Sequence, residues 1–231
     1  MATSGSADLT MTSREIVTQA MVLLQQISYG ETPAAEDAEQ YRISLNLMIK
    51  TWGAAGRLWL TEEGSIPLVA STASYALTGV RKVFQVRRRI TSTVSDLELR
   101  EDSRSDYYAR PNKASTGAPL AWYFDPQRTT KTLYVWPAPD TTAASTMTLQ
   151  YTYARFIEDV DALDDEADVP QEWLEALVYG LARRMGPATG SANKPEYAQI
   201  KEDAERLYAA LSSVDQEEAS IMLQPNLMGG A

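Results

Sequence analysis

The chain has 231 residues, 44% of them hydrophobic, and a formal net charge of −10 at pH 7. It contains neither histidine nor cysteine, which excludes Ser-His-Asp triads, thiolate nucleophiles, disulfides and zinc sites built on those residues. An acidic chain is also not expected to bind nucleic acid over a wide surface, because binding phosphates requires basic patches.

Other sequence signals are missing as well. No apolar run approaches the roughly 20 residues that span a membrane. The first ten residues lack the basic and apolar regions of a secretory signal. We therefore expect a soluble protein made in a cytoplasm. No glycine-rich phosphate-binding motif occurs, so we expect no cofactor, and we predict neither a metal site nor catalytic residues.

The first sixty residues predict two helices. Thr12 and Glu15 form a T-x-x-E capping box, and an apolar stripe at helical spacing follows them. A second helix is predicted to begin with Thr32 as its N-cap and Pro33 in its first turn. Two amphipathic helices joined by a short loop indicate an antiparallel helical hairpin over residues 12–60.

Residues 64–155 change to a period of two, which is typical of strands. Apolar and polar residues alternate over 147–153, which predicts a half-buried strand. Shorter strands are predicted at 74–77 and 96–99. Several short strands separated by turn signals indicate an antiparallel sheet, a sandwich or a small barrel.

One predicted strand contains a misfit. Phe84, Val86 and Ile90 share an apolar face, but Arg88 falls on the same side. A β-bulge or an exposed strand end would resolve this conflict. The arginine run at 87–89 is not expected to form one basic patch, because alternate residues of a strand point to opposite faces. We interpret it as serving solubility or ion pairs between subunits.

Residues 120–136 predict a β-hairpin with one face in the core. Leu120, Trp122 and Phe124 share one predicted strand face, and Ala121, Tyr123 and Asp125 share the other. Asp125-Pro126 begins the turn. A stacking platform for single-stranded nucleic acid is the alternative. Such a platform would need basic residues interleaved with the aromatic ones, and only the turn carries them.

The last part of the chain again predicts helices, over residues 168–212, with Pro170 and Pro195 at their starts. The tail that follows, residues 213–231, is first acidic and then apolar, and it is too short to fold alone. We predict that the tail docks on another protein. The predicted docking residues are Ile221, Met222, Leu223, Leu227 and Met228.

The segment 158–168 holds seven acidic side chains and no basic one. It fails the calcium-loop template, because the position that requires glycine is Asp164. We interpret it as a solvated linker. An alternative is a glycoside-hydrolysing carboxylate pair, in which Glu172 or Glu175 would act with an aspartate of this segment.

These elements together predict an α+β fold. An antiparallel bundle of about four helices would form from residues 12–60 and 168–212. An antiparallel β module at 64–155 would be inserted between the two parts of the bundle, and an extended tail would occupy 213–231.

Several segments recur together in an order that resembles the head-to-tail adaptor proteins of short-tailed bacteriophages. The likeness covers about residues 12–211. The segments are AEDAEQYRISLNLMIKTWGAAGRLW, a strand at Tyr75-Ala76-Leu77, the N-K-x-x-x-G-x-P-x-x-x-Y-x-x-P run from Asn112 to Pro126, the W-P-x-P from Trp136 to Pro139, and VPQEWLEALVYGLARRM.

The resemblance implies a structural, non-enzymatic protein of the virion. It implies a ring, usually of twelve copies, that binds below the portal protein and extends the DNA channel. The ring would carry the tail nozzle and the tail fibres or spikes, and genomic DNA would pass through it without specific recognition. Assembly would take place in the host cytoplasm, and no membrane is involved. An acidic chain fits a channel that DNA must not stick to.

Two other functions stay open from the residues themselves. One is a carboxylate-dependent hydrolase of the virion that opens peptidoglycan. The other is a tail module whose β part binds glycans or another protein.

Overall fold

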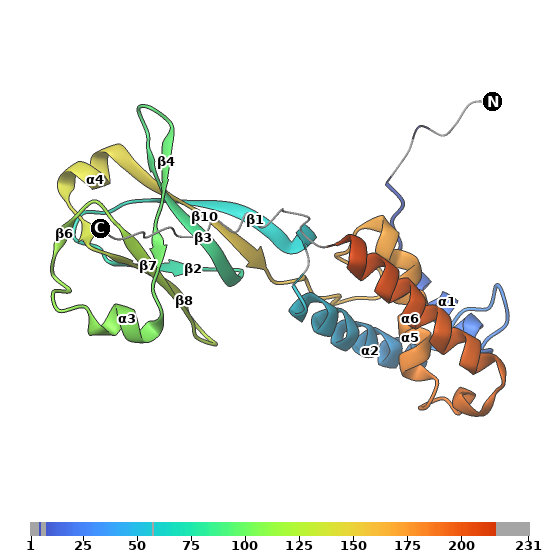
Figure 1. The fold of residues 1–231 in the computed structure, drawn as a ribbon. Helices are drawn as coiled ribbons and strands as arrows, with labels where there is room; N and C mark the ends of the chain where they lie inside the picture. Colours follow the sequence, from blue (N-terminus) through green and yellow to red (C-terminus); the bar gives the residue numbers. More distant parts are fainter. Residues whose placement is uncertain (1–4, 6–7, 57, 216–231) are drawn as a thin grey trace, which may run out of the picture.

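The computed structural model describes residues 5, 8–56 and 58–215 of the chain. It is a mixed α+β protein, as predicted, with two lobes joined by a narrow junction (Figure 1). Most of the helices form one lobe, and the strands form the other. The five predicted docking residues of the tail lie outside the described residues.

The helical lobe is built from the two ends of the described chain. Its helices surround one core, in which Ile16, Leu45, Leu177 and Leu181 are fully buried. The α-helices are α1 (Ser13–Leu23), α2 (Ala35–Ala54), α5 (Leu174–Met185) and α6 (Glu196–Val214), with short 3-10 turns η1 (Leu58–Leu60), η2 (Gln171–Trp173) and η3 (Ser191–Asn193). These helices bring sequence-distant residues together, since α1 packs against α5.

The helix starts agree only partly with the prediction. The capping box at Thr12 and Glu15 is present, with both reciprocal hydrogen bonds. The predicted start of the second helix at Thr32 and Pro33 is wrong, because α2 begins at Ala35 and has no side-chain cap. Two acidic residues in the first turn of α2 supply negative charge to the positive end of the helix dipole instead.

The β lobe contains two four-stranded sheets that share one core. The first sheet is antiparallel, in the order β1 (Thr61–Pro67), β10 (Met147–Arg155), β3 (Val80–Ile90) and β4 (Ser95–Glu98). The second has the order β2 (Ser74–Leu77), β8 (Lys131–Trp136), β7 (Ala121–Pro126) and β5 (Arg100–Glu101), with β5 parallel to β7. A parallel pair, β6 (Thr116–Gly117) and β9 (Ala138–Pro139), and the helices α3 (Arg104–Ala109) and α4 (Thr141–Thr146) complete the lobe.

The third strand contains a bulge, but the bulge does not remove the misfit at Arg88. Residues 86–90 pair with 147–151 without interruption, so Arg88 stays half-buried on the side of the buried Val86. Gln85 pairs with Thr152 and Val83 pairs with Tyr153, so Phe84 is the extra residue of β3. The bulge turns both Val83 and Val86 into the core and leaves Phe84 43% exposed. The predicted core position of Phe84 is therefore wrong.

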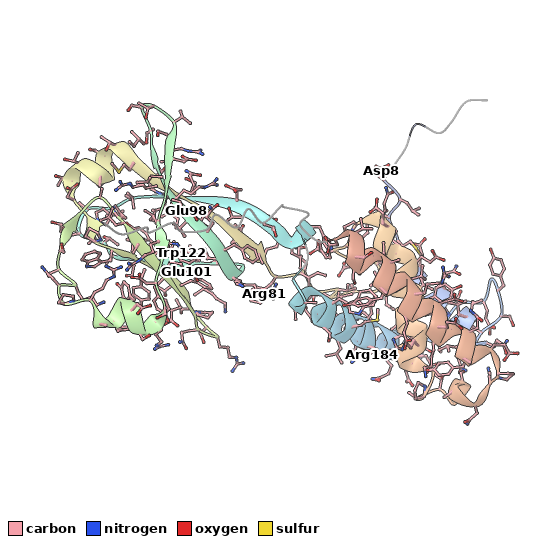
Figure 2. The ribbon with its side chains drawn as sticks, in the orientation of Figure 1. Asp8, Arg81, Glu98, Glu101, Trp122 and Arg184 are labelled. Atoms are coloured by element: carbon pink, nitrogen blue, oxygen red, sulfur yellow. The ribbon has the colours of Figure 1, made fainter. Side chains whose placement is uncertain are left out.

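The predicted hairpin is present as β7 and β8, and Trp122 is almost fully buried between the sheets (Figure 2). Its indole Nε1 donates to the carbonyl of Leu99 at 3.2 Å. The prediction of a single covered face is wrong, because Tyr107 of α3 stacks on Tyr123 on the other side. Leu120 precedes the strand and is 53% exposed.

Two chain segments cross the junction between the lobes. One contains η1 and leads into β1, and the other leaves β10. Leu60 and Ile157 from these segments are buried in the helical core, where Ile157 approaches Gly53. Arg81 of β3 reaches across (Figure 2) and its Nη1 donates to the carbonyl of Ala54 at the end of α2, at 3.2 Å. The β lobe is thus anchored through the core of the helical lobe.

Candidate interaction site

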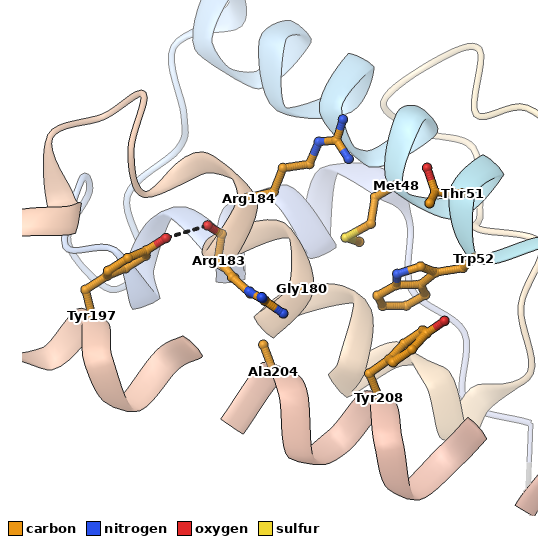
Figure 3. Close-up of a pocket in the computed structure, with 9 residues that line it drawn as sticks. All are labelled: Met48, Thr51, Trp52, Gly180, Arg183, Arg184, Tyr197, Ala204 and Tyr208. Atoms are coloured by element: carbon orange, nitrogen blue, oxygen red, sulfur yellow. Dashed lines mark hydrogen bonds between the residues drawn. The ribbon is translucent and has the colours of Figure 1, made fainter. Parts of the chain in front are cut away.

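A groove crosses the surface of the helical lobe between α2 and α6, and α5 forms its floor (Figure 3). Apolar and aromatic side chains lie beside arginines in it. The lining residues are Met48, Thr51, Trp52, Gly180, Arg183, Arg184, Tyr197, Ala204 and Tyr208. We call this surface the arginine groove.

Small residues and aromatic rings shape the arginine groove. Gly180 lies against Met48 and Trp52, and a Cβ at this position would come within 3.0 Å of both side chains. The Trp52 ring is 5.0 Å from the Tyr208 ring and 5.8 Å from the Trp173 ring, measured between centroids. This aromatic cluster closes the end of the groove nearest to the junction.

The two arginines lie one turn of α5 beyond Gly180. Arg183 forms an ion pair with Glu205 of α6 at 2.8 Å, and its backbone carbonyl accepts a hydrogen bond from the Tyr197 hydroxyl at 2.7 Å. Arg184 is exposed and forms no ion pair with any described residue. The groove therefore offers an available cation next to an apolar surface.

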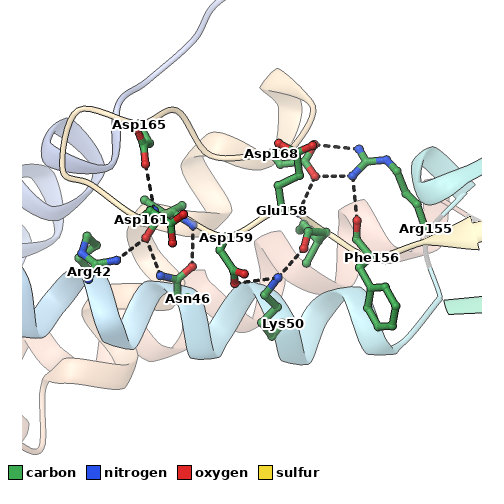
Figure 4. Close-up of polar contacts among 12 residues, drawn as sticks. Arg42, Asn46, Lys50, Arg155, Phe156, Glu158, Asp159, Asp161, Asp165 and Asp168 are labelled. Carbon is green, nitrogen blue, oxygen red and sulfur yellow. Dashed lines mark hydrogen bonds and ion pairs between the residues drawn. The ribbon is translucent and has the colours of Figure 1, made fainter. Parts of the chain in front are cut away.

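The acidic segment 158–168, which we call the acidic strap, is not a solvated linker. It runs along α2, held by three side chains of that helix (Figure 4). Arg42 and the amide of Asn46 donate to the carbonyl of Val160, and Asn46 also accepts the Val160 N–H at 2.9 Å. Lys50 pairs with Asp159 at 2.9 Å. Since Val160 is buried, the strap is part of the helical lobe.

The far end of the strap closes over α1. The N–H groups of Ser13 and Arg14 donate to the carbonyls of Asp165 and Leu163, both at 2.8 Å. The buried Ser13 hydroxyl donates to the carbonyl of Ala162 at 2.9 Å. Helix starts have free N–H groups, so these contacts satisfy the first turn of α1 as well as the strap.

The strap ends in an ion pair at the junction. Nη2 of Arg155, the last residue of β10, lies 2.8 Å from Oδ1 of Asp168, and its Nε lies 3.1 Å from Glu62 of β1. The Asp168 carboxylate also accepts the N–H of Glu158 at 2.9 Å. Burial raises the pKa of Asp168, but the hydrogen bonds from Arg155 and Glu158 outweigh it and hold this pKa below its usual value.

Replacing Asp168 with asparagine is expected to lower the free energy of unfolding at pH 7 by about 1–3 kcal/mol, because Arg155 loses its partly buried anionic partner. The pKa of Asp168 is lower in the folded state than in the unfolded state. The ionised carboxylate therefore stabilises the fold at pH values above the unfolded-state pKa, which is about 3.9. That stability is lost as the pH falls through the folded pKa. Urea denaturation at pH 7 and pH 3 should show the difference between wild type and variant shrinking in acid.

The matched control for Asp168 is Asp164, whose side chain is 83% exposed in its pair with Arg14. The Asp164→Asn variant should lose no more than about 1 kcal/mol. An equal loss for Asp168→Asn at both pH values would show that the carboxylate charge does not stabilise the junction.

The two glutamates proposed for hydrolysis lie on the protein surface. Glu172 and Glu175 are both exposed at the start of the α5 region. Among the described residues, no group of three or more acidic side chains is placed to hold a metal ion. The arrangement therefore gives no geometric support to a hydrolase.

The arginine run at 87–89 has partners within the chain. Arg87 pairs with Glu63, Arg89 pairs with Asp96 at 2.6 Å, and Arg88 donates to the carbonyl of Pro119 at 3.1 Å. The interpretation of this run as serving solubility or ion pairs between subunits stays a prediction. These arginines tie β3 to its neighbours within the β lobe.

Sequence reasoning missed the arginine groove. The rings of Trp52 and Tyr208 come from two different helices and meet at an open surface. Two signals pointed to the groove: the glycine inside α5 and the adjacent arginines near its end. A glycine inside a helix is tolerated where another element approaches closely.

Membrane insertion has no support in the helices, since none of those described is both long and apolar enough to cross a bilayer.

Comparisons with known proteins give one family. The family model described as SU10 adaptor protein matches residues 11–227. No curated protein matches the chain. A chain of the solved structure titled "Neck of empty GTA particle computed with C6 symmetry" is 12% identical, with 77% of this chain and 81% of that chain covered. Its TM-score is 0.28, which is too low to support a conclusion about fold or function.

Proposed function

Because the chain belongs to the SU10 adaptor protein family, we propose that it is a structural connector between the head and the tail of a phage particle. The observation that carries this proposal is the family match, which spans nearly all of the described chain. It agrees with the resemblance to head-to-tail adaptors, which rests on segments from both lobes. The two-lobed shape supports the proposal, since a connector has to present several separate surfaces.

In this proposal the protein forms a ring, with twelve copies as the expected number, below the portal at the head–tail junction of the virion. The helices α1, α2, α5 and α6 act as the bundle domain that builds the ring, and the β lobe acts as an inserted domain that offers a platform to the tail nozzle and fibres. The net charge of −10 suits a channel through which DNA slides without binding.

Portal binding is assigned in this proposal to the tail after α6. Its apolar residues Ile221, Met222, Leu223, Leu227 and Met228 supply the docking surface, with acidic residues before them. The connector needs no catalysis. The exposed positions of Glu172 and Glu175 favour it over a hydrolase.

Native mass spectrometry of the protein mixed with the portal protein of the same genome tests this proposal. We expect a complex with a fixed number of copies per portal ring, lost when residues 216–231 are removed. If the two proteins stay apart at micromolar concentration, the connector function is wrong for this partner. Peptidoglycan turnover that is lost in Glu172→Gln or Glu175→Gln would favour the hydrolase.

A further inference from the structure

The helical lobe carries two surfaces of opposite character on opposite flanks of α2. The acidic strap contacts Asn46 and Lys50, whereas the arginine groove contains Met48 and Trp52. Met48 and Trp52 each follow by two positions an α2 residue that contacts the strap, and two positions of an α-helix correspond to a rotation of about 200°. The two surfaces therefore face away from each other within one copy.

We propose that the arginine groove of one copy receives the acidic strap of the next copy. The proposal rests on the ring proposed above and names the contact between its subunits. A contact between two different surfaces is heterologous, and a heterologous contact repeated by a rotation closes into a ring.

The charges of the two surfaces are complementary. Arg184 is exposed in the groove without an ion pair among the described residues, and Arg183 beside it is 44% exposed. On the strap, the exposed carboxylates of Glu158 and Asp161 likewise form no ion pair with described residues. The groove therefore presents an exposed positive charge, and the strap presents exposed negative charges of the opposite sign.

The apolar parts also correspond. Phe156 lies two positions before the strap, at the junction end of α2 (Figure 4), and is 46% exposed. The aromatic part of the groove, Trp52 and Tyr208, lies at the same end of α2. An aromatic side chain placed against Trp52 and Tyr208 would bury the apolar surface that the groove leaves open.

The two surfaces overlap in height along α2. The strap is held by residues from Arg42 to Lys50, and the groove includes Met48 to Trp52. A rotation about an axis parallel to α2 keeps such heights unchanged. It would bring the strap of one copy to the level of the groove of the next, with carboxylates near the arginines.

The chain contains no cysteine, so paired cysteines provide a direct test. Asp161→Cys and Arg184→Cys are introduced together, and the assembled protein on the portal is treated with a short bis-maleimide. The two positions face apart in one copy, so a link between them has to join two copies. We expect a ladder of covalent oligomers from the double variant and only uncrosslinked chains from either single variant.

Charge reversal gives an independent readout. Arg184→Glu should reduce the fraction of the protein in rings at least tenfold in native mass spectrometry, and Asp161→Lys added to it should restore part of the assembly. Arg128→Glu, at an exposed position of the β7–β8 turn, is the matched control and should assemble normally.

The outcomes separate this inference from the function on which it rests. The proposed interface is wrong if Arg184→Glu forms rings normally, or if rings of the double-cysteine variant give no ladder of crosslinked oligomers. Either result would leave the proposed connector function unaffected. Dimers from either single-cysteine variant would show a contact between like surfaces, which also overturns the interface. If the wild-type protein forms no ring with or without the portal, the proposed function and the interface fail together.

Discussion

Replacing Trp122 with alanine is expected to lower the free energy of unfolding by about 3–5 kcal/mol, the usual range for a large buried aromatic residue. Trp122 is 2% exposed and fills the space between the two sheets of the β lobe. The substitution leaves a cavity there and also leaves the carbonyl of Leu99 without its indole donor. Chemical denaturation followed by circular dichroism measures the loss.

Leu120 is the matched control, because it lies two residues away on the same predicted face but is 53% exposed. The Leu120→Ala variant should change the free energy of unfolding by no more than about 0.5 kcal/mol. Similar losses for the two variants would contradict the packing described for the hairpin.

Replacing Leu181 with alanine is expected to lower the free energy of unfolding of the helical lobe by about 2–5 kcal/mol. Leu181 is fully buried in the core that α1, α2, α5 and α6 share. The same denaturation experiment measures the effect. Leu47→Ala on α2 is the control, because that leucine is 54% exposed and should contribute little.

The two variants also test whether the lobes behave as separate domains, since the two cores have no buried residue in common. Hydrogen exchange should show Trp122→Ala loosening the strands while the helices stay protected, and Leu181→Ala doing the reverse. If either variant loosened both lobes equally, the chain would unfold as one cooperative unit and the domain division would be wrong.

Local patterns predicted the elements that depend on neighbouring residues. The capping box at Thr12 and the hairpin of β7 and β8 are set by short-range signals, and both are present. The α+β class followed from the change of hydrophobic period along the chain. Thr32 and Pro33 match the pattern of a helix start, but α2 begins at Ala35, where the first turn contains two acidic residues.

Features that depend on distant residues were not predictable in the same way. The bulge at Phe84 is visible only in the pairing with β10. The acidic strap has the composition of a linker, yet Arg42, Asn46 and Lys50 hold its backbone to α2. Periodicity could not show those contacts, because the residues that make them are more than a hundred positions apart.

The arginine groove was hidden for a related reason. Its side chains come from α2, α5 and α6, and each helix alone presents an ordinary amphipathic stripe. Only the packing of the three helices shows that Trp52 and Tyr208 border an open surface beside Arg184 (Figure 3). A site formed between helices needs their relative placement, which no single segment encodes.

A cryo-EM reconstruction of the portal vertex, in particles of the phage that encodes this chain, tests the connector function most directly. We expect a ring of copies between the portal and the tail, with both lobes recognisable in each subunit. A complete vertex in which no density fits the helical lobe or the β lobe would contradict the assignment as a head-to-tail connector.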